Sequence, residues 1–451
     1  HLLLPYSILR PKRILIFGPG GGLEILYALR MKADDITIVE PNKKVLDIMK
    51  KYYAEEIDSL LGQDCMRFIN DDYRAFLSRT QEKYDLIILP ALGEFGGSVG
   101  LNALNENTLF TLEAFTEMLE KLKRGGLISA TFWNDSPPKI TLRMPVLISE
   151  SLAVRNIQRP EKNIAAVRSW GTISYVFGPE ELCEEQIAKM KRFCEENSFD
   201  PFFYHDISKK ERTEYNFVED ETVFELTDLI FSESKENTVN TYDFKIDAPT
   251  DDQPYFSQFI KADKLFSQIQ QYGGKSVVFN ELGYLILFLT LCTVSIFSII
   301  FIILPLFSLR RHKKHGPWVF ICFAGLGFAY MFIEIVLIKH FVFFLGRQVF
   351  STSAVISLML ISSGFGSLYS SRLKTERRVL FIISALIIFL ILLYTVLLGP
   401  LLTSLVGLPF PVRVFLSFII IALPGFFMGM PFPLGLRFTD SLNPTQVPWA
   451  W

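Results

Sequence analysis

Cysteine is scarce in this chain and follows no pattern. Its five cysteines form no CxxC pair and have no regular spacing: Cys65, Cys183, Cys194, Cys292 and Cys322. Disulfide frameworks and zinc sites depend on such spacings, so we expect neither, and we expect no bound metal. The chain also lacks a basic stripe, which argues against nucleic acid as a partner.

Negative charge is nearly missing from the second part of the chain. Residues 1–280 carry 33 Lys and Arg against 43 Asp and Glu, a net charge near −10. Residues 281–451 carry 12 Lys and Arg against 4 Asp and Glu, near +8. The first part has globular composition and is long enough for its own core. No signal peptide is visible and the chain starts at His1 without Met, so we expect a fragment cut at both ends.

Long apolar runs fill the part that lacks acids. A bilayer core of roughly 30 Å needs about 20 apolar residues per helix. The runs are too long, and too poor in polar faces, for buried helices of a soluble protein. We predict five membrane spans, near residues 283–307, 317–340, 350–371, 379–400 and 412–435. The predicted organisation is a soluble domain over 1–262, a linker over 263–281 and an all-α transmembrane helix bundle over 282–451.

A glycine-rich turn follows the first strand-like run of the chain. Arg13–Ile16 leads into Gly18, Gly20 and Gly22, and a second run, Ile36–Val39, ends in Glu40. Glycines let the backbone turn tightly and approach a ligand where a Cβ would clash. A carboxylate at the end of the next strand can accept hydrogen bonds from both ribose hydroxyls. The pattern indicates a nucleotide-binding βαβ unit, with an ordinary tight turn as the alternative.

Alternating strands and helices continue after Glu40. The sequence predicts strands over 67–70, 84–89, 127–132 and 173–177, and helices over 42–55, 107–123 and 179–197. Such alternation favours a doubly wound parallel sheet, an α/β Rossmann-like fold. Ligands bind beyond the carboxyl ends of its strands, where Asp71, Asp72 and 90–97 also lie. Residues 206–245 are polar and predict an exposed excursion, whereas the turn 251–256 either closes the site or ends the domain.

At this point the order of motifs resembles the S-adenosylmethionine-type methyltransferase fold and, within it, the spermidine synthase family. The pieces that carry the resemblance are Ile16–Gly22, Val39–Pro41, Asn70–Leu77 and Tyr84–Ile88. A narrower resemblance, to spermidine synthase-like integral membrane proteins, rests on Leu104–Phe115, Asp251–Phe256, Phe328–Gly346 and Gly429–Arg437.

The resemblance implies a cofactor site for S-adenosylmethionine or decarboxylated S-adenosylmethionine. Gly18, Gly20 and Gly22 would pass under the methionine-derived portion, Glu40 would hold the ribose, and Asp72 would accept from the adenine amino group. Asp71 is a further candidate, with a structural cap as its alternative. The substrate implied is a small-molecule amine. For the assembly, we expect a homodimer.

The chain departs from the family at the catalytic turn. Aminopropyltransferases carry an Asp just after the fourth strand and a second Asp three residues on. Here Pro90 and Gly93 stand at those places, and neither can take a proton. Glu94 is the nearby carboxylate, one residue displaced, and is our candidate for the catalytic base or amine holder.

The predicted membrane spans contain one cluster of ionisable residues. Glu334 lies within the second span, followed by Lys339 and His340. An ionisable group inside hydrocarbon normally faces a bundle interior or water. The alternatives are a polar ligand or proton site, or contacts that hold helices together. Small residues over 362–371 predict close helix–helix packing.

Basic residues between the predicted spans conflict with a soluble domain that uses a cofactor made in the cytoplasm. They cluster at 310–314 and again at Arg372, Lys374, Arg377 and Arg378, which the positive-inside rule places in the cytoplasm. With five spans the soluble domain would then lie outside, away from the S-adenosyl cofactors made in the cytoplasm. We expect a protein of the cell inner or plasma membrane with its soluble domain in the cytoplasm.

These observations predict a membrane-anchored, spermidine synthase-like transferase that moves an aminopropyl or methyl group to an amine. Two alternatives stay open. One is a catalytically inactive nucleoside-binding sensor domain. The other is a polyamine or small-molecule transport protein whose substrate lies near Glu334.

Overall fold

The chain divides into two compact units, His1–Leu289 and Thr290–Trp451. The computed structural model describes residues 1–52, 65–92, 102–217, 221–261, 263–264, 270, 282–305, 316–346, 348–442, 444 and 447. Most of the predicted linker over 263–281 lies outside these residues, and so does Glu94.

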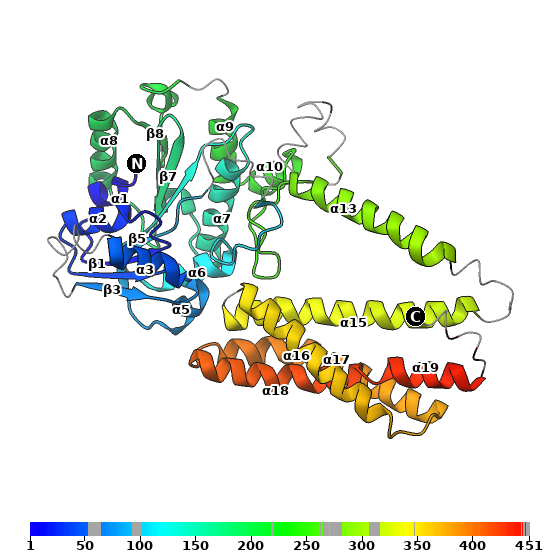
Figure 1. Ribbon diagram of the computed structural model, residues 1–451. Coiled ribbons are helices and arrows are strands. Elements are labelled where there is room, and N and C mark those ends of the chain that lie inside the picture. Colours follow the sequence, from blue (N-terminus) through cyan, green and yellow to red (C-terminus); the bar gives the residue numbers. More distant parts are fainter. Residues whose placement is uncertain are drawn as a thin grey trace. The chain divides into compact units, whose positions relative to one another are not determined.

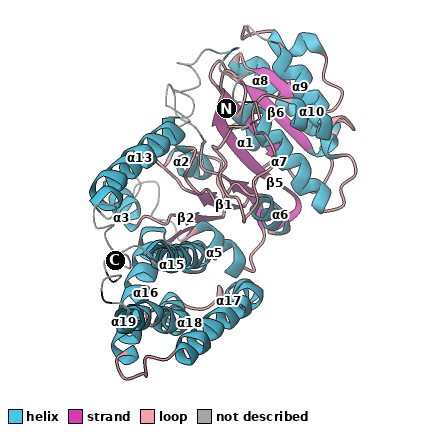
Figure 2. Ribbon diagram, turned by 90° about the vertical axis from the view of Figure 1, so that its right-hand side faces the viewer, coloured by secondary structure: helices cyan, strands magenta, loops and turns pink. Residues whose placement is uncertain are grey.

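One eight-stranded sheet forms the centre of the first unit, with the strand order β3-β2-β1-β4-β5-β7-β6-β8. The sheet lies between helices on both faces (Figures 1 and 2). The strands are β1 (Arg13–Phe17), β2 (Asp35–Val39), β3 (Met66–Ile69), β4 (Tyr84–Ile88), β5 (Leu122–Trp133), β6 (Ile164–Arg168), β7 (Thr172–Phe177) and β8 (Asp200–Phe203).

The sheet is mixed, which corrects the prediction of a parallel one. Strands β1 to β5 pair in parallel, as expected. Strand β7 runs antiparallel to both β5 and β6, and β8 runs antiparallel to β6. Only 169–171 separate β6 from β7, and so short a connection can join antiparallel strands only, because parallel strands need a long crossover.

Two hydrophobic cores form because successive strand residues point to opposite faces of the sheet. In β1, Leu15 and Phe17 belong to one core, whereas Ile14 and Ile16 belong to the other. The helices over the first core are α5 (Tyr73–Arg79), α6 (Leu112–Glu120) and α7 (Ile140–Val154). The second core is covered by α1 (Leu4–Ile8), α2 (Leu23–Arg30), α3 (Lys43–Tyr52) and α8 (Glu184–Asn197).

The expected exposed excursion over 206–245 is wrong in part. A short 3₁₀ helix (Lys209–Thr213), α9 (Thr222–Ile230) and α10 (Lys235–Thr241) form within it. Helix α9 buries Phe224, Thr227 and Ile230, which recur every three residues and so share one face. The polar composition of the segment conceals this apolar stripe.

The second unit is helical where it is described. Among the described residues, five helices are long and apolar enough to cross a membrane: Gly283–Ile303, which begins in the first unit, Trp318–Leu345, Val349–Ser370, Arg377–Leu405 and Phe410–Leu442. They comprise α13 (Leu282–Ser298) with a π-helical turn (Ile299–Ile303), α15 (Gly316–Leu345), α16 (Gln348–Ser370), α17 (Arg377–Leu405), α18 (Phe410–Met428) and α19 (Pro431–Leu442). The five predicted spans match these helices.

Helices α16 and α18 pack with their backbones in direct contact. A Cβ placed on Gly366 would overlap the carbonyl oxygen of Phe426, and one on Gly429 would overlap that of Ser363. The close packing predicted from the small residues over 362–371 is therefore confirmed for Gly366.

Candidate functional site: the carboxyl edge of strands β1 to β4

The glycine turn is built at the carboxyl end of β1. Gly18, Gly20 and Gly22 all have positive φ angles, of 59°, 50° and 84°, a region that side chains other than glycine rarely adopt. The amide of Gly18 donates to the carbonyl of Val39 at 3.0 Å, which ties the turn to the end of β2. No heavy atom lies within 4 Å of a Cβ placed on Gly20 or Gly21, so the middle of the turn is open.

Glu40 lies at the carboxyl end of β2 and is 8% exposed. Its Oε1 accepts from the amide of Asn42 at 2.8 Å, while Asn70 Nδ2 donates to the backbone carbonyl of Glu40 at 2.9 Å. Burial raises the pKa of Glu40, and the Asn42 amide only partly offsets this. The carboxylate is therefore held in place as an acceptor at the edge of the sheet.

Asp71 and Asp72 follow β3 and act first on the backbone. One carboxylate oxygen of Asp72 accepts from the amides of Arg74 and Ala75, at 3.0 and 3.2 Å, and so caps α5. Asp71 forms an ion pair with Arg79. The structural alternative stated for Asp71 agrees with this contact, and its role toward a cofactor stays a prediction.

Tyr73 brings the predicted residues together. A Cβ on Gly18 would lie 2.7 Å from its hydroxyl, and its ring meets Phe17 edge-on at 5.4 Å. Burial raises the pKa of Tyr73 well above its usual value, and the charges of Glu40 and Asp72 raise it further. Gly18 thus lies against the phenol, and the charges of Glu40 and Asp72 act on it. Sequence reasoning missed Tyr73, although it directly follows the two acids.

The chain after β4 packs against the glycine turn. The Cβ of Pro90 lies 3.0 Å from a Cβ placed on Gly18. Leu92 accepts from Trp133 and donates to Thr131, each at 3.0 Å, so residues 90–92 continue along β5. This places Pro90 beside the glycine turn. Glu94, the candidate base, is outside the described residues.

Arg74 joins α5 to α6 and to the turn 251–256. Its side chain is 6% exposed and pairs with Glu117 at 2.9 Å and with Asp251 at 2.8 Å. Asp251 also accepts from the Thr111 hydroxyl at 2.6 Å. The turn is therefore attached to the helices that follow β3 and β4.

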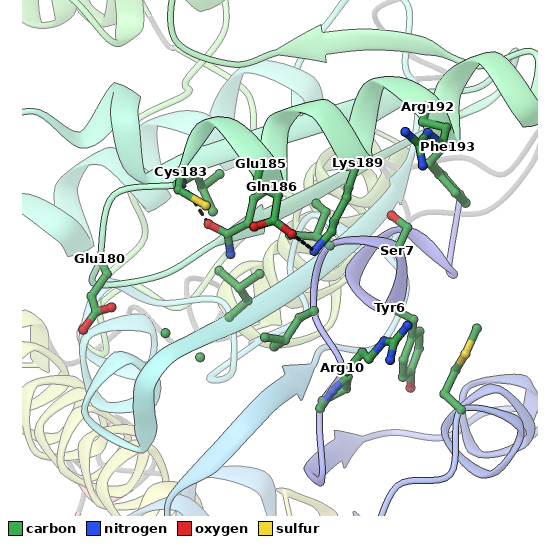
Figure 3. Close-up of a pocket in the computed structure, with 18 of the residues that line it drawn as sticks. Tyr6, Ser7, Arg10, Glu180, Cys183, Glu185, Gln186, Lys189, Arg192 and Phe193 are labelled. Carbon is green, nitrogen blue, oxygen red and sulfur yellow. Dashed lines mark hydrogen bonds and ion pairs between the residues drawn. The ribbon is translucent and has the colours of Figure 1, made fainter.

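A cavity of about 1240 Å³ lies at the edge of the sheet opposite the glycine turn. Figure 3 shows its walls, which come from α1, α8 and the segments before β1 and after β7. Lys189 and Glu185 pair across one turn of α8 at 2.7 Å, and Arg10 and Arg192 lie at its rim (Figure 3). The edge is the amino end of β1, so the cavity is separate from the glycine turn.

The three ionisable residues predicted for the membrane unit do not share one environment. Glu334 is 9% exposed, Lys339 is exposed, and His340 lines a cavity of about 230 Å³ beside α17. Within the residues that the structure describes, no three His, Cys, Asp or Glu side chains form a group that could hold a metal ion.

The geometry of the first unit defines a class: a Rossmann-like α/β fold with a glycine turn at the carboxyl end of β1. Residues 3–177 match the family model of the spermine/spermidine synthase domain. The first unit is therefore similar to spermine/spermidine synthase domains over these residues.

Curated relatives show the same similarity. The polyamine aminopropyltransferase of Korarchaeum cryptofilum is 27% identical over 122 residues, covering 27% of this chain and 36% of the relative. That of Buchnera aphidicola is 31% identical over 121 residues, covering 24% of this chain and 42% of the relative. The chain thus spans less than half the length of these relatives.

A solved spermidine synthase from Thermotoga maritima aligns at 16% identity with a TM-score of 0.29, covering 50% of this chain and 68% of that one. At so low a score the alignment adds nothing to the sheet order as an argument for the fold.

Proposed function

We propose that the first unit is a spermidine synthase-like transferase, anchored by the apolar helices of the second unit. It binds S-adenosylmethionine or its decarboxylated form over the glycine turn and transfers a methyl or aminopropyl group to an amine. The observation that carries the proposal is the open glycine turn, which Gly18 ties to the end of β2 beside Glu40, in a unit whose relatives are aminopropyltransferases.

Each of these residues has a part in binding. The open backbone at Gly20 and Gly21 leaves room for the sulfonium portion. Glu40, fixed by Asn42 at 2.8 Å, accepts from the ribose hydroxyls. Asp72, fixed by its cap on α5, faces the adenine amino group. Buried carboxylates that accept hydrogen bonds from neutral donors gain strength in a low-dielectric site.

The transfer needs a proton acceptor. The amine nitrogen attacks the carbon attached to the sulfonium, the C–N bond forms and the C–S bond breaks. The electron pair of the C–S bond stays on sulfur, and the amine nitrogen loses one proton. General base catalysis contributes about 10²–10⁴-fold. Pro90 offers no such base, so we assign the role to Glu94.

Calorimetry on the full chain tests the binding step. S-adenosylmethionine and its decarboxylated form are titrated separately, and at least one of them should bind. The Glu40→Gln variant is the control, and it should bind the same ligand more weakly. Lack of binding by both ligands would remove the proposal.

A second function is favoured by Pro90 itself. A domain that binds the nucleoside but has no base would act as a sensor and not as an enzyme. Mass spectrometry of amine products separates the two. An enzyme forms an aminopropylated or methylated amine and loses at least ~100-fold in rate in Glu94→Gln, whereas a sensor binds the cofactor and forms no product.

A further inference from the structure

The cavity of about 1240 Å³ at the amino end of β1 lies apart from the residues used in the function proposed above. Its wall contains five basic residues and four acids: Arg10, Arg30, Lys32, Lys189 and Arg192, with Glu180, Glu181, Glu185 and Glu196. The basic residues come from the segment before β1, from the end of α2 and the turn after it, and from α8. Residues 1–280 carry 33 Lys and Arg against 43 Asp and Glu, so a wall with more bases than acids is an exception within this unit.

Most of the acids in the wall already have a basic partner. The pairs are Glu185 with Lys189 at 2.7 Å, Glu180 with Arg124 at 3.3 Å, and Glu181 with Lys162 at 3.5 Å. Arg124 and Lys162 are not part of the wall, so two of its acids are neutralised from outside it. Glu196 is the acid of the wall for which the described residues show no ion pair.

Most of the bases, by contrast, have no partner. Within the described part of the chain, no hydrogen bond or ion pair reaches the side chains of Arg10, Arg30, Lys32 and Arg192. All four residues are exposed, and Figure 3 shows Arg10 and Arg192 on separate segments around the cavity. Four unpaired bases against one unpaired acid leave an excess of three positive charges. Charges of one sign along a concave wall raise the local concentration of ions of the opposite sign.

Gln186 adds a neutral donor whose orientation is fixed. Its Oε1 accepts from the backbone amide of Cys183 at 2.9 Å (Figure 3). This bond identifies the oxygen, because the amide nitrogen of a glutamine side chain can only donate. The Nε2 group therefore remains as a donor in the wall, and no described residue accepts from it.

The wall also has an apolar part. Ile8, Leu127 and Phe193 line the cavity and belong to the second hydrophobic core. The volume is at or above the usual range of small-molecule pockets, about 300–1,000 Å³. The cavity therefore has room for a ligand with several charged groups.

We propose that this cavity binds a small soluble anion with three or more negative charges. Its phosphate or carboxylate groups pair with Arg10, Arg192 and the bases at the end of α2, and Gln186 donates to one of its oxygens. Guanidinium groups suit this task because they bind phosphate and carboxylate through two parallel hydrogen bonds. The site is at the edge of the sheet opposite the glycine turn, so the inference does not rest on the function proposed above.

Calorimetric titration of the full chain in phosphatidylcholine nanodiscs tests the proposal. The probes are inorganic tripolyphosphate and citrate, which have neither a ribose nor a purine and so lack the groups that Glu40 and Asp72 would hold. We expect at least one of them to bind with a Kd below about 1 mM. Acetate, with a single charge, should bind at least ~10-fold more weakly. Added NaCl should weaken binding, because salt screens exposed charges.

Variants locate the site. Arg10→Gln combined with Arg192→Gln should weaken binding of the better probe at least ~10-fold. The matched control is Arg155→Gln combined with Lys209→Gln, which removes two positive charges outside the wall and should leave affinity within about twofold. Glu196→Gln removes the unpaired acid and should tighten binding roughly two- to fivefold.

Four results would each overturn the proposal. They are no binding of either probe at millimolar concentration, equal binding of acetate, full affinity in a monodisperse Arg10→Gln/Arg192→Gln protein, and weaker binding in Glu196→Gln. Nanodiscs that contain phosphatidylglycerol separate a soluble ligand from lipid headgroups. We expect the same affinity there, whereas loss of binding would assign the wall to anionic lipid and overturn the assignment to a soluble anion.

Discussion

The ionised carboxylate of Glu40 lowers the stability of the fold and serves the proposed binding of the cofactor. Burial raises the pKa of Glu40, so the folded unit bears a cost for the ionised carboxylate at neutral pH. We attribute to the same ionised carboxylate the hold on the ribose. Residues at functional sites commonly lower stability in this manner.

Glu40→Gln should therefore stabilise the unit at pH 7–8 and abolish most cofactor affinity. The folded pKa of Glu40 is raised, so as pH falls through it the carboxyl protonates and its burial cost disappears. The gain in Tm of the variant should accordingly shrink toward acid pH, while cofactor binding by the unaltered protein weakens over the same range. Thermal unfolding and calorimetry at several pH values measure both. A Tm difference that does not change with pH contradicts this account.

Gly18→Ala should impair both folding and binding. Its Cβ would meet the Tyr73 hydroxyl at 2.7 Å and Pro90 at 3.0 Å, at a φ of 59°. Left-handed backbone costs ~1–2 kcal/mol, and overpacking adds ~1–3 kcal/mol. Denaturant unfolding of Gly18→Ala and of Gly21→Ala measures the loss in the free energy of unfolding. Gly21→Ala is the matched control, because nothing lies within 4 Å of its Cβ; equal losses in the two variants would refute the steric argument.

The candidate site was predictable where its chemistry is local in sequence. The glycine turn and Glu40 were identified because strand, turn and acid follow one another. Tyr73 was missed, because only folding brings its hydroxyl from α5 to Gly18. The helix cap made by Asp72 and the ion pair between Asp71 and Arg79 likewise depend on the fold, and the residue types alone do not predict them.

Among the helices and strands, the sequence indicated types better than directions. Strand β7 was recognised but assigned to a parallel sheet, because an apolar run says nothing about strand direction. Helix α9 was missed because charged residues surround its apolar stripe. By contrast, the long apolar helices match the predicted spans, since length and lack of charge suffice to find them.

Contact between α16 and α18 should depend on single glycines. In Gly366→Ala the new Cβ would overlap the Phe426 carbonyl oxygen, so the helices must separate. We expect a loss of at least ~1–3 kcal/mol, measured as thermal unfolding of the full chain in detergent. Gly364→Ala, two residues away with nothing within 4 Å, should leave stability equal or raise it slightly, because alanine favours helix. Similar destabilisation by both would mean that the helices do not pack through Gly366.

At the scale of the whole molecule, the function depends on which side of the membrane holds the first unit. The basic residues at 310–314 lie outside the described residues, and those at 372–378 follow α16. If both groups are cytoplasmic, five spans place the first unit on the other side. A transferase there would have no S-adenosyl cofactor, so our proposal requires a cytoplasmic first unit.

Cys183 provides a natural probe of that side. It is exposed at the start of α8 in the first unit, whereas Cys322 lies within the apolar span of α15. We expect a membrane-impermeant maleimide to leave Cys183 unlabelled in intact cells and to label it after lysis, with Cys183→Ser abolishing that signal. Mass spectrometry of the labelled peptide identifies the thiol. Labelling in intact cells would place the first unit outside, and the site at Glu40 would then need a nucleoside ligand available there, because cytoplasmic S-adenosylmethionine could not reach it.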